Sequence, residues 1–183
     1  MAGRSRPHWL CLGGLLLLFL LVQPARPSCA QFSARDGQII ARMMSFIETS
    51  NRGLVEIGIV YAADQPTSVR QAESMRAAIG DALIAGRVTL KARMVPVDQL
   101  GSASNLGGIF VVSDLGSRLD DIAAAAQRLH IPTISTEQAC VRTARCILAY
   151  SSQPTVEILL NHDAANTAGV RFSQAFRMLV REL

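Results

Sequence analysis

The sequence predicts a single α/β domain in three layers, with helices on both faces of a largely parallel sheet. Stretches rich in β-branched and apolar residues alternate along the chain with stretches whose apolar residues recur every three or four positions. That alternation is the order of strands and crossover helices in a parallel sheet. Residues 108–114 are apolar almost without interruption, which is typical of a strand buried on both faces.

The first half of the domain is predicted to form a helix, a strand, a second helix and a second strand. Apolar residues recur at helical spacing over 38–47, and 55–61 is a β-rich run. The second helix is expected to open near Thr67 and to carry its apolar face as far as Leu83. Apolar and polar residues alternate over 88–94, which predicts a half-buried or edge strand.

The second half is predicted to complete a Rossmann-like domain with a C-terminal β-hairpin and helix. It begins with the central strand at 108–114. The later elements are expected to be a helix, a strand, two hairpin strands and a closing helical segment, at 119–129, 131–135, 146–151, 155–160 and 163–183.

Residues 1–30 have the composition of a secretory signal peptide. Basic residues precede an uncharged run of 14 residues from Trp9 to Val22, and small residues follow at Ser28 and Ala30. A helix that spans a bilayer needs about 20 apolar residues. We therefore expect cleavage after Ala30, a mature domain of 31–183 and a periplasmic location.

The mature chain would keep two of the four cysteines, Cys140 and Cys146. An exported protein with one closely spaced pair is expected to form a disulfide, here a structural staple of a hairpin. Zinc would need four ligands, and only His130 and His162 accompany these thiols. A redox pair usually has two intervening residues, whereas this pair has five. The disulfide is the favoured interpretation, and no metal is expected.

Charge gives little support to a nucleic-acid partner. The whole chain carries 18 basic and 14 acidic residues, but three of the arginines lie in the predicted leader. The mature domain is therefore almost neutral and has no basic stripe.

Several polar residues are candidates for a site, and each has a simpler structural role. Residues 66–68 are expected to start a helix more than to hold an anion. Asp114 follows the central strand and is expected to cap the next helix, although it could accept a hydrogen bond from a ligand. Asp120 and Asp121 are expected on a solvated helix face, and His130 at a helix end. No nucleotide-binding glycine loop or nucleophile elbow is present, so we expect no cofactor and no enzymatic activity.

The C-terminal third carries a fairly specific pattern. The residues that define it are Asn161, Asp163, Ala164, Ala165, Gly169, Arg171 and Ser173. Read physically, Asn161 or Asp163 would cap a helix, Gly169 would permit a left-handed helix exit, and Ser173 would cap the last helix.

On these residues the chain resembles the YfiR family of exported bacterial proteins. That family's domain ends in a strand, an Asn, an Asp-Ala-Ala helix, a Gly-Leu-Arg-Ile-Ser-like turn and a last helix. The resemblance also matches Cys140 and Cys146 to a cysteine pair that precedes the terminal hairpin. It implies a periplasmic repressor that binds the periplasmic part of a membrane-bound diguanylate cyclase and lowers cyclic di-GMP. Homodimerisation is implied by the resemblance alone.

An exported small-molecule-binding module is the alternative. Residues 58–61, 65–68 and 111–114 also look like one lobe of an ABC-transporter substrate-binding protein, although such proteins usually have two lobes and about twice the length. Arg142 and Arg145 could face an acidic partner, but a solvated loop is the simpler expectation.

Overall fold

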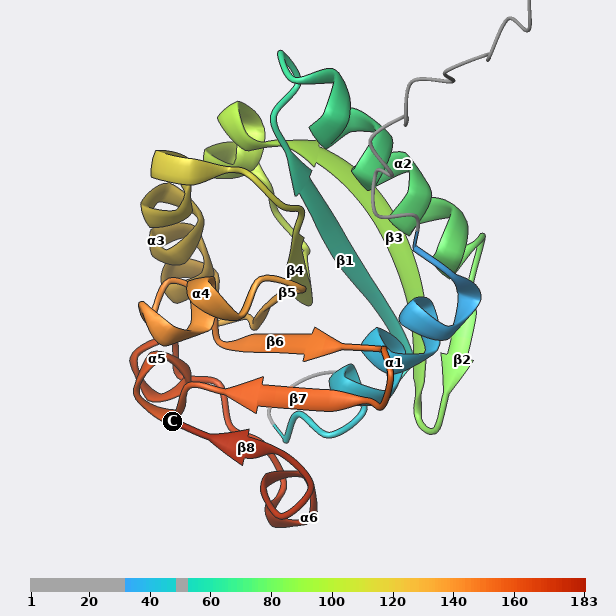
Figure 1. Ribbon diagram of the computed structural model, residues 1–183, viewed down its shortest axis with the longest axis vertical. Coiled ribbons are helices and arrows are strands. Elements are labelled where there is room, and N and C mark those ends of the chain that lie inside the picture. The colour runs from blue at the N-terminus through green and yellow to red at the C-terminus, as the bar shows by residue number, and fades with distance from the viewer. Residues whose placement is uncertain (1–31, 49–52) are drawn as a thin grey trace, which may run out of the picture.

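The computed structural model describes residues 32–48 and 53–183, and one eight-stranded sheet forms its centre (Figure 1). The leader predicted at 1–30 lies outside the described residues. From edge to edge the strand order is β2-β3-β1-β4-β5-β6-β7-β8. In chain order the strands are Gly53–Tyr61, Leu83–Ala85, Val88–Pro96, Gly108–Val111, Thr133–Ser135, Leu148–Ser151, Glu157–Leu160 and Arg181–Glu182.

The middle of the sheet is parallel and its edges are mixed. β3, β1, β4, β5 and β6 run in one direction, whereas β2 and β7 each run antiparallel to a neighbour. The β6–β7 pair is the predicted hairpin. The strand expected over 108–114 is β4, all four of whose residues are buried between β1 and β5.

One edge differs from the prediction. The helix expected to reach Leu83 ends at Ile79, because Gly80 adopts a left-handed φ of 70° and turns the chain. Leu83 then begins β2, which pairs with β3. The strand predicted over 88–94 as half-buried or at an edge is β3, which is half-buried but lies inside the sheet, between β2 and β1.

Helices cover both faces of the sheet, as predicted. The crossover β1-α2-β3 runs toward one edge and β4-α3-β5 toward the other, so right-handed connections place α2 and α3 on opposite faces. The helix α1 packs beside α2. The helices α1 to α6 are Ala34–Met44, Pro66–Ile79, Leu119–Leu129, Gln138–Arg142, His162–Thr167 and Gln174–Arg177, with 3-10 turns at Val97–Ser102 and Gly116–Arg118.

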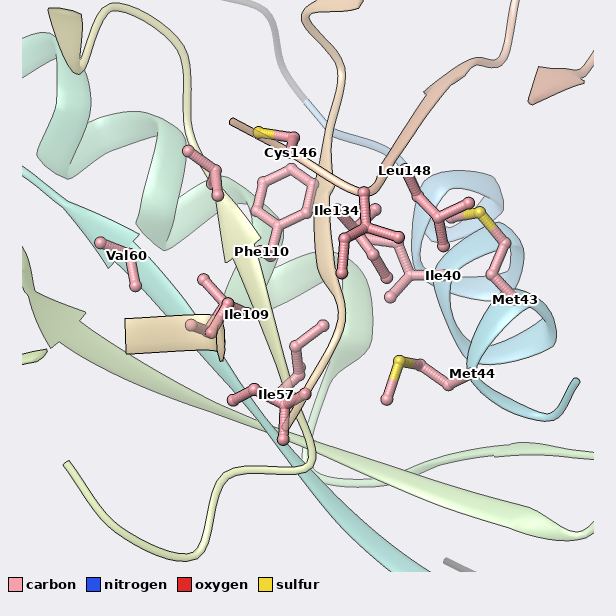
Figure 2. Close-up of a cluster of buried hydrophobic side chains, with 14 of the residues drawn as sticks. Ile40, Met43, Met44, Ile57, Val60, Ile109, Phe110, Ile134, Cys146 and Leu148 are labelled. Atoms are coloured by element: carbon pink, nitrogen blue, oxygen red, sulfur yellow. The ribbon is translucent and has the colours of Figure 1, made fainter. Parts of the chain in front are cut away.

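Part of the core lies between α1 and the middle of the sheet, and the rest packs under α2, α3, α4, α5 and α6. Ile40, Met43 and Met44 project from α1 into the cluster drawn in Figure 2 and are almost fully buried. Phe110 of β4 and Leu148 of β6 belong to the same cluster.

The closing helical segment predicted over 163–183 consists of two short helices, α5 and α6, and the strand β8. The last helix, α6, has four residues, and β8 then pairs with β7 in parallel. An edge strand exposes unpaired backbone groups, and β8 covers part of that edge. Among the described residues no helix is long and apolar enough to cross a membrane.

Candidate functional site

The crevice where doubly wound sheets usually bind ligands is filled by side chains here. It lies between the carboxyl ends of β1 and β4, where the strand order reverses. Ser68 is buried and its hydroxyl accepts from the Ala62 N–H at 2.9 Å. Buried Gln71 accepts from the Ser113 N–H at 3.0 Å. Residues 66–68 therefore start a helix, as expected, and Ser68 is turned inward.

Asp114 does not cap the following helix, so that expectation was wrong. Its backbone adopts a left-handed φ of 66°, and its N–H donates to the Glu137 carboxylate at 3.0 Å. No side chain accepts from the first N–H groups of the 3-10 turn that begins at Gly116. The turn after β4 is thus held by Glu137, the residue before α4, rather than by a cap.

An open hollow lies further along the same edge of the sheet, where β5 and β6 end and α1 begins. Its volume is about 360 Å³. The lining residues come from these three elements and the loops beside them, and are Phe32, Ser33, Arg35, Asp36, Thr136, Tyr150, Ser151, Ser152 and Gln153. We take this hollow as the candidate functional site.

Asp36 lies at the wall of the hollow and is largely buried, with 7% of its surface exposed. Its Oδ2 accepts hydrogen bonds from the Ser33 N–H at 2.8 Å and the Ser33 hydroxyl at 2.6 Å. Burial would raise the pKa of Asp36, but these bonds from Ser33, with the nearby hydroxyls of Ser152 and Tyr150, lower it below its ordinary value. The carboxylate is therefore ionised at neutral pH.

Tyr150 is the unusual member of the site. The residue is 1% exposed, and its hydroxyl has no hydrogen-bond partner of good geometry among the described residues. Burial, and then the neighbouring Asp36 charge, raise the pKa of Tyr150 beyond its ordinary range. The hydroxyl is therefore neutral, and it lies beside a carboxylate without a well-formed bond to it.

The aromatic side of the hollow is held by α2 and β4. The Phe32 N–H donates to the Ser74 hydroxyl at 2.8 Å. The Phe32 ring meets the Phe110 ring edge to face, with 5.3 Å between centroids. These contacts place the residues before α1 against the carboxyl end of the sheet.

Sequence reasoning did not single out Asp36 or Tyr150. The spacing of Ser33 and Asp36 is that of a capping pair at a helix start, and this signal could have located Asp36. Tyr150 lies in an apolar strand, and its position in the sequence does not show what surrounds its hydroxyl. Only the packing of α1 on β6 brings the two residues together.

The structure joins Cys140 and Cys146 in a disulfide, with their Cα atoms 5.1 Å apart. The bond closes the turn between α4 and β6 rather than the β6–β7 hairpin. Both cysteines are buried. Of the two arginines between them, Arg142 contacts Gln138 and is solvated, whereas Arg145 pairs with Asp120 of α3 at 2.8 Å.

The remaining acidic and histidine candidates have structural roles. Asp120 and Asp121 are exposed, as predicted, and Asp121 pairs with Arg118 at 3.5 Å. His130 ends α3 in a left-handed conformation, and its ring Nδ1 lies 3.1 Å from the Ala168 carbonyl. Within residues 32–48 and 53–183 no group of three or more His, Cys, Asp or Glu side chains could hold a metal.

The C-terminal pattern has the local structure that its residues predict. Asn161 caps α5 by accepting from the Ala164 N–H at 2.8 Å. Gly169 has a left-handed φ of 69°, and Ser173 caps α6 through the Phe176 N–H. These residues shape the chain around α5 and α6 and lie outside the hollow.

Two of the hollows near the C-terminus border the last helix, α6. The larger, about 620 Å³, is bordered by the ion pair of Arg177 and Glu182, whose closest atoms are 2.6 Å apart. The other is an apolar groove of about 270 Å³ between α1, β7 and α6. Neither contains a buried polar side chain without a partner among the described residues.

No protein-family model matches the chain, and no curated protein matches it significantly in sequence. Solved structures share its fold. A conserved domain protein from Vibrio cholerae is 13% identical with a TM-score of 0.57, covering 81% of this chain and 59% of its own. An ABC domain from Streptococcus pneumoniae in complex with L-Trp is 13% identical with a TM-score of 0.55, covering 81% and 60%.

A third similar structure is the ligand-free, open form of a substrate-binding protein with adhesive properties from Clostridium difficile. It is 12% identical with a TM-score of 0.58, covering 83% of this chain and 60% of its own. The chain therefore spans about three fifths of the length of these structures. The similarity establishes a Rossmann-like fold of the kind found in lobes of substrate-binding proteins.

Proposed function

We propose that this chain is an exported, non-enzymatic binding domain that holds a small polar molecule in the hollow between β5, β6 and α1. The main evidence for this proposal is that the Tyr150 hydroxyl is buried and has no hydrogen-bond partner of good geometry among the described residues. A buried hydroxyl without a partner lowers the free energy of unfolding by roughly 1–3 kcal/mol. A ligand that forms a hydrogen bond with this hydroxyl would remove the destabilisation.

The position of the hollow supports the same function. In open α/β sheets, ligands bind outside the carboxyl ends of the strands. Ser68 and Gln71 fill the usual crevice, and the open hollow lies beside the carboxyl end of β6 instead. Two of the similar structures are described as binding a substrate or an amino acid, and neither is described as an enzyme.

The composition of the site supports binding more than catalysis. No histidine or cysteine lines the hollow, and its one described carboxylate is engaged by Ser33. A nucleophile with an adjacent base is therefore not formed by the lining residues. The Cys140–Cys146 disulfide supports an oxidising compartment, such as the periplasm.

A thermal-shift screen of polar metabolites on the purified domain tests this function. A ligand present at 100 times its Kd raises the free energy of unfolding by about 2.7 kcal/mol. We expect a hit to raise the Tm of the wild type and to raise that of Tyr150→Phe less. Tyr61→Phe is the matched control, because Tyr61 lies at the end of β1 outside the hollow. Equal shifts in all three proteins, or no hit, would reject the hollow as a binding site.

A second function is proposed for the apolar groove: repression of a membrane diguanylate cyclase, as the YfiR resemblance implies. Leu179 is 73% exposed at the groove, beside Val156 and Phe46. Arg35 and Arg42 line the groove and form no ion pair among the residues described. A partner with acidic residues around an apolar surface would fit, and the periplasmic part of the cyclase would be that partner.

The concentration of cyclic di-GMP in the host tests the second function. We expect deletion of the gene to raise cyclic di-GMP and the wild-type gene to lower it again. Leu179→Asp should fail to restore repression. Ile84→Asp is the control, because Ile84 is equally exposed but lies on β2 at the other edge of the sheet. Unchanged cyclic di-GMP on deletion would exclude repression and leave the binding function standing.

A further inference from the structure

Two of the five hydroxyl groups around the hollow donate their protons within the protein. The Ser33 hydroxyl donates to Asp36 at 2.6 Å, and the Ser151 hydroxyl donates to the Gln153 carbonyl at 2.9 Å. Each hydroxyl has one proton and two lone pairs, so both oxygens still have acceptor capacity. The hollow is therefore rich in acceptors.

Asp36 adds a negative charge to this set. It takes part in none of the ion pairs among the described residues. Its Oδ2 is occupied by Ser33, and no hydrogen bond of good geometry reaches its other oxygen within the described chain. The start of α1 stabilises the carboxylate, but a helix end provides only a partial positive charge.

Tyr150 shows that capping does not account for the whole arrangement. The capping interaction of Ser33 explains why Asp36 is tolerated in the wall of the hollow. It does not explain a buried hydroxyl that lies beside the carboxylate without a hydrogen bond of good geometry. A group placed between them could donate to both oxygens.

We infer that the hollow binds a small molecule through a primary or secondary ammonium group, with Asp36 as its counter-ion and the Tyr150 hydroxyl oxygen as an acceptor. This inference rests on the proposed binding function and names the ligand class. An anion would be repelled by Asp36 at the wall. A neutral hydroxyl ligand would leave the charge unpaired, whereas an ammonium group satisfies both the charge and the acceptors.

Arg35 at the mouth does not oppose this assignment. Its side chain is exposed, so water and salt screen its charge from the buried carboxylate. It also offers a counter-ion to a carboxylate elsewhere on the same ligand. Amines and amino acids therefore both belong to the class, and simple carboxylic acids do not.

Methylammonium and tetramethylammonium form a matched pair of probes. Both are cations small enough for the hollow, but only methylammonium has N–H donors. We would titrate each into the purified full chain and follow amide signals by two-dimensional NMR. We expect saturable shifts at Ser33, Asp36 and Tyr150 with methylammonium, and weaker or no saturation with tetramethylammonium.

Substitutions of Tyr150 and Asp36 test which side chains contact the ammonium group. Tyr150→Phe should weaken methylammonium binding about fivefold, which corresponds to one hydrogen bond of about 1 kcal/mol. Its stability should be unchanged or raised, since an unpartnered hydroxyl is removed. Asp36→Asn should weaken binding more than tenfold. If that variant does not fold, Tyr150→Phe against Tyr61→Phe still decides the result.

The outcomes separate this inference from the proposed function. If neutral or anionic metabolites bind with dependence on Tyr150 while methylammonium does not, the ammonium assignment is wrong and the binding function stands. If nothing binds, both fail. Equal affinity of wild type and Tyr150→Phe for methylammonium would also overturn the assignment, because the hydroxyl would then take no part.

Discussion

The side-chain amide of Asn161 donates to the Val141 carbonyl, 2.9 Å away, and so ties the start of α5 to the disulfide-bridged turn. The amide oxygen of Asn161 meanwhile accepts from the Ala164 N–H. One buried side chain thus caps a helix and gives a carbonyl of α4 a second donor beside the Ala144 N–H. Aspartate could perform only the first role, because its carboxylate has no N–H to donate.

Replacement of Asn161 should separate these two roles. We expect Asn161→Ala to lower the free energy of unfolding by about 1–2 kcal/mol, since it removes the cap and one of the two hydrogen bonds that the Val141 carbonyl accepts, the other being from the Ala144 N–H at 3.1 Å. Asn161→Asp keeps the cap, but it places a carboxylate against the Val141 carbonyl. Urea denaturation measures all variants, with Asn166→Ala as a control on the exposed side of α5. Equal losses in Asn161→Ala and Asn166→Ala would refute a structural role for the Val141 contact.

Because the disulfide closes a small ring, it should raise the free energy of unfolding only modestly. Closure of a loop of this length corresponds to about 2 kcal/mol in the chain-entropy model. We expect Cys140→Ala with Cys146→Ala to lower the free energy of unfolding by about that amount plus the loss of two buried sulfur atoms. Alanine is preferred to serine because both sites are buried. Reduction of the wild type should reproduce the entropic part, and an unchanged unfolding midpoint after reduction would contradict it.

The fold could be predicted where local patterns decide the structure. The apolar run of β4 and the alternation of strands and helices were enough to predict the three layers. The roles of Asn161, Gly169 and Ser173 follow from each residue and its near neighbours. β2 and β8 could not be predicted in this way. Each is short, and each exists because an open sheet edge is available to pair with it.

The candidate site depends on contacts that no local pattern reveals. Asp36 and Tyr150 are more than a hundred positions apart in the chain, and they meet only because α1 packs on the end of β6. Gln71 and Ser68 close the crevice between β1 and β4, next to Asp114, which the sequence offered as a residue that could accept a hydrogen bond from a ligand. Whether such a crevice is open depends on side-chain packing across elements.

Gly37 should be intolerant of any side chain. A Cβ atom there would lie 2.5 Å from the backbone carbonyl oxygen of Ala78, so α1 and α2 pack with no room between them. We expect Gly37→Ala to lower the free energy of unfolding by about 2 kcal/mol or more, although alanine favours helices intrinsically. Gly101→Ala is the control, because its Cβ would meet nothing within 4 Å. Similar urea midpoints for the two variants would show that α1 can shift freely.

The acid sensitivity of the domain should depend in part on Asp36. Burial opposes its ionisation, but the bonds from Ser33 prevail and hold the pKa of Asp36 below its ordinary value of 3.8. A lowered pKa in the folded state means that the unfolded chain binds the proton more readily. The resulting stabilisation is present above the ordinary value and is lost as the pH falls through the folded-state pKa.

Asp36→Asn should therefore be less stable than the wild type near neutral pH by about 1 kcal/mol, and the difference should shrink below about pH 4. Urea unfolding at a series of pH values measures it. Asp64→Asn is the control, since Asp64 is exposed in the loop before α2 and makes no ion pair among the described residues. Because an ammonium ligand would pair with the same carboxylate, methylammonium should stabilise the wild type above this pH range and lose its effect as Asp36 becomes protonated. A stability difference that persists unchanged to low pH would mean that packing, and not the charge of Asp36, distinguishes the two proteins.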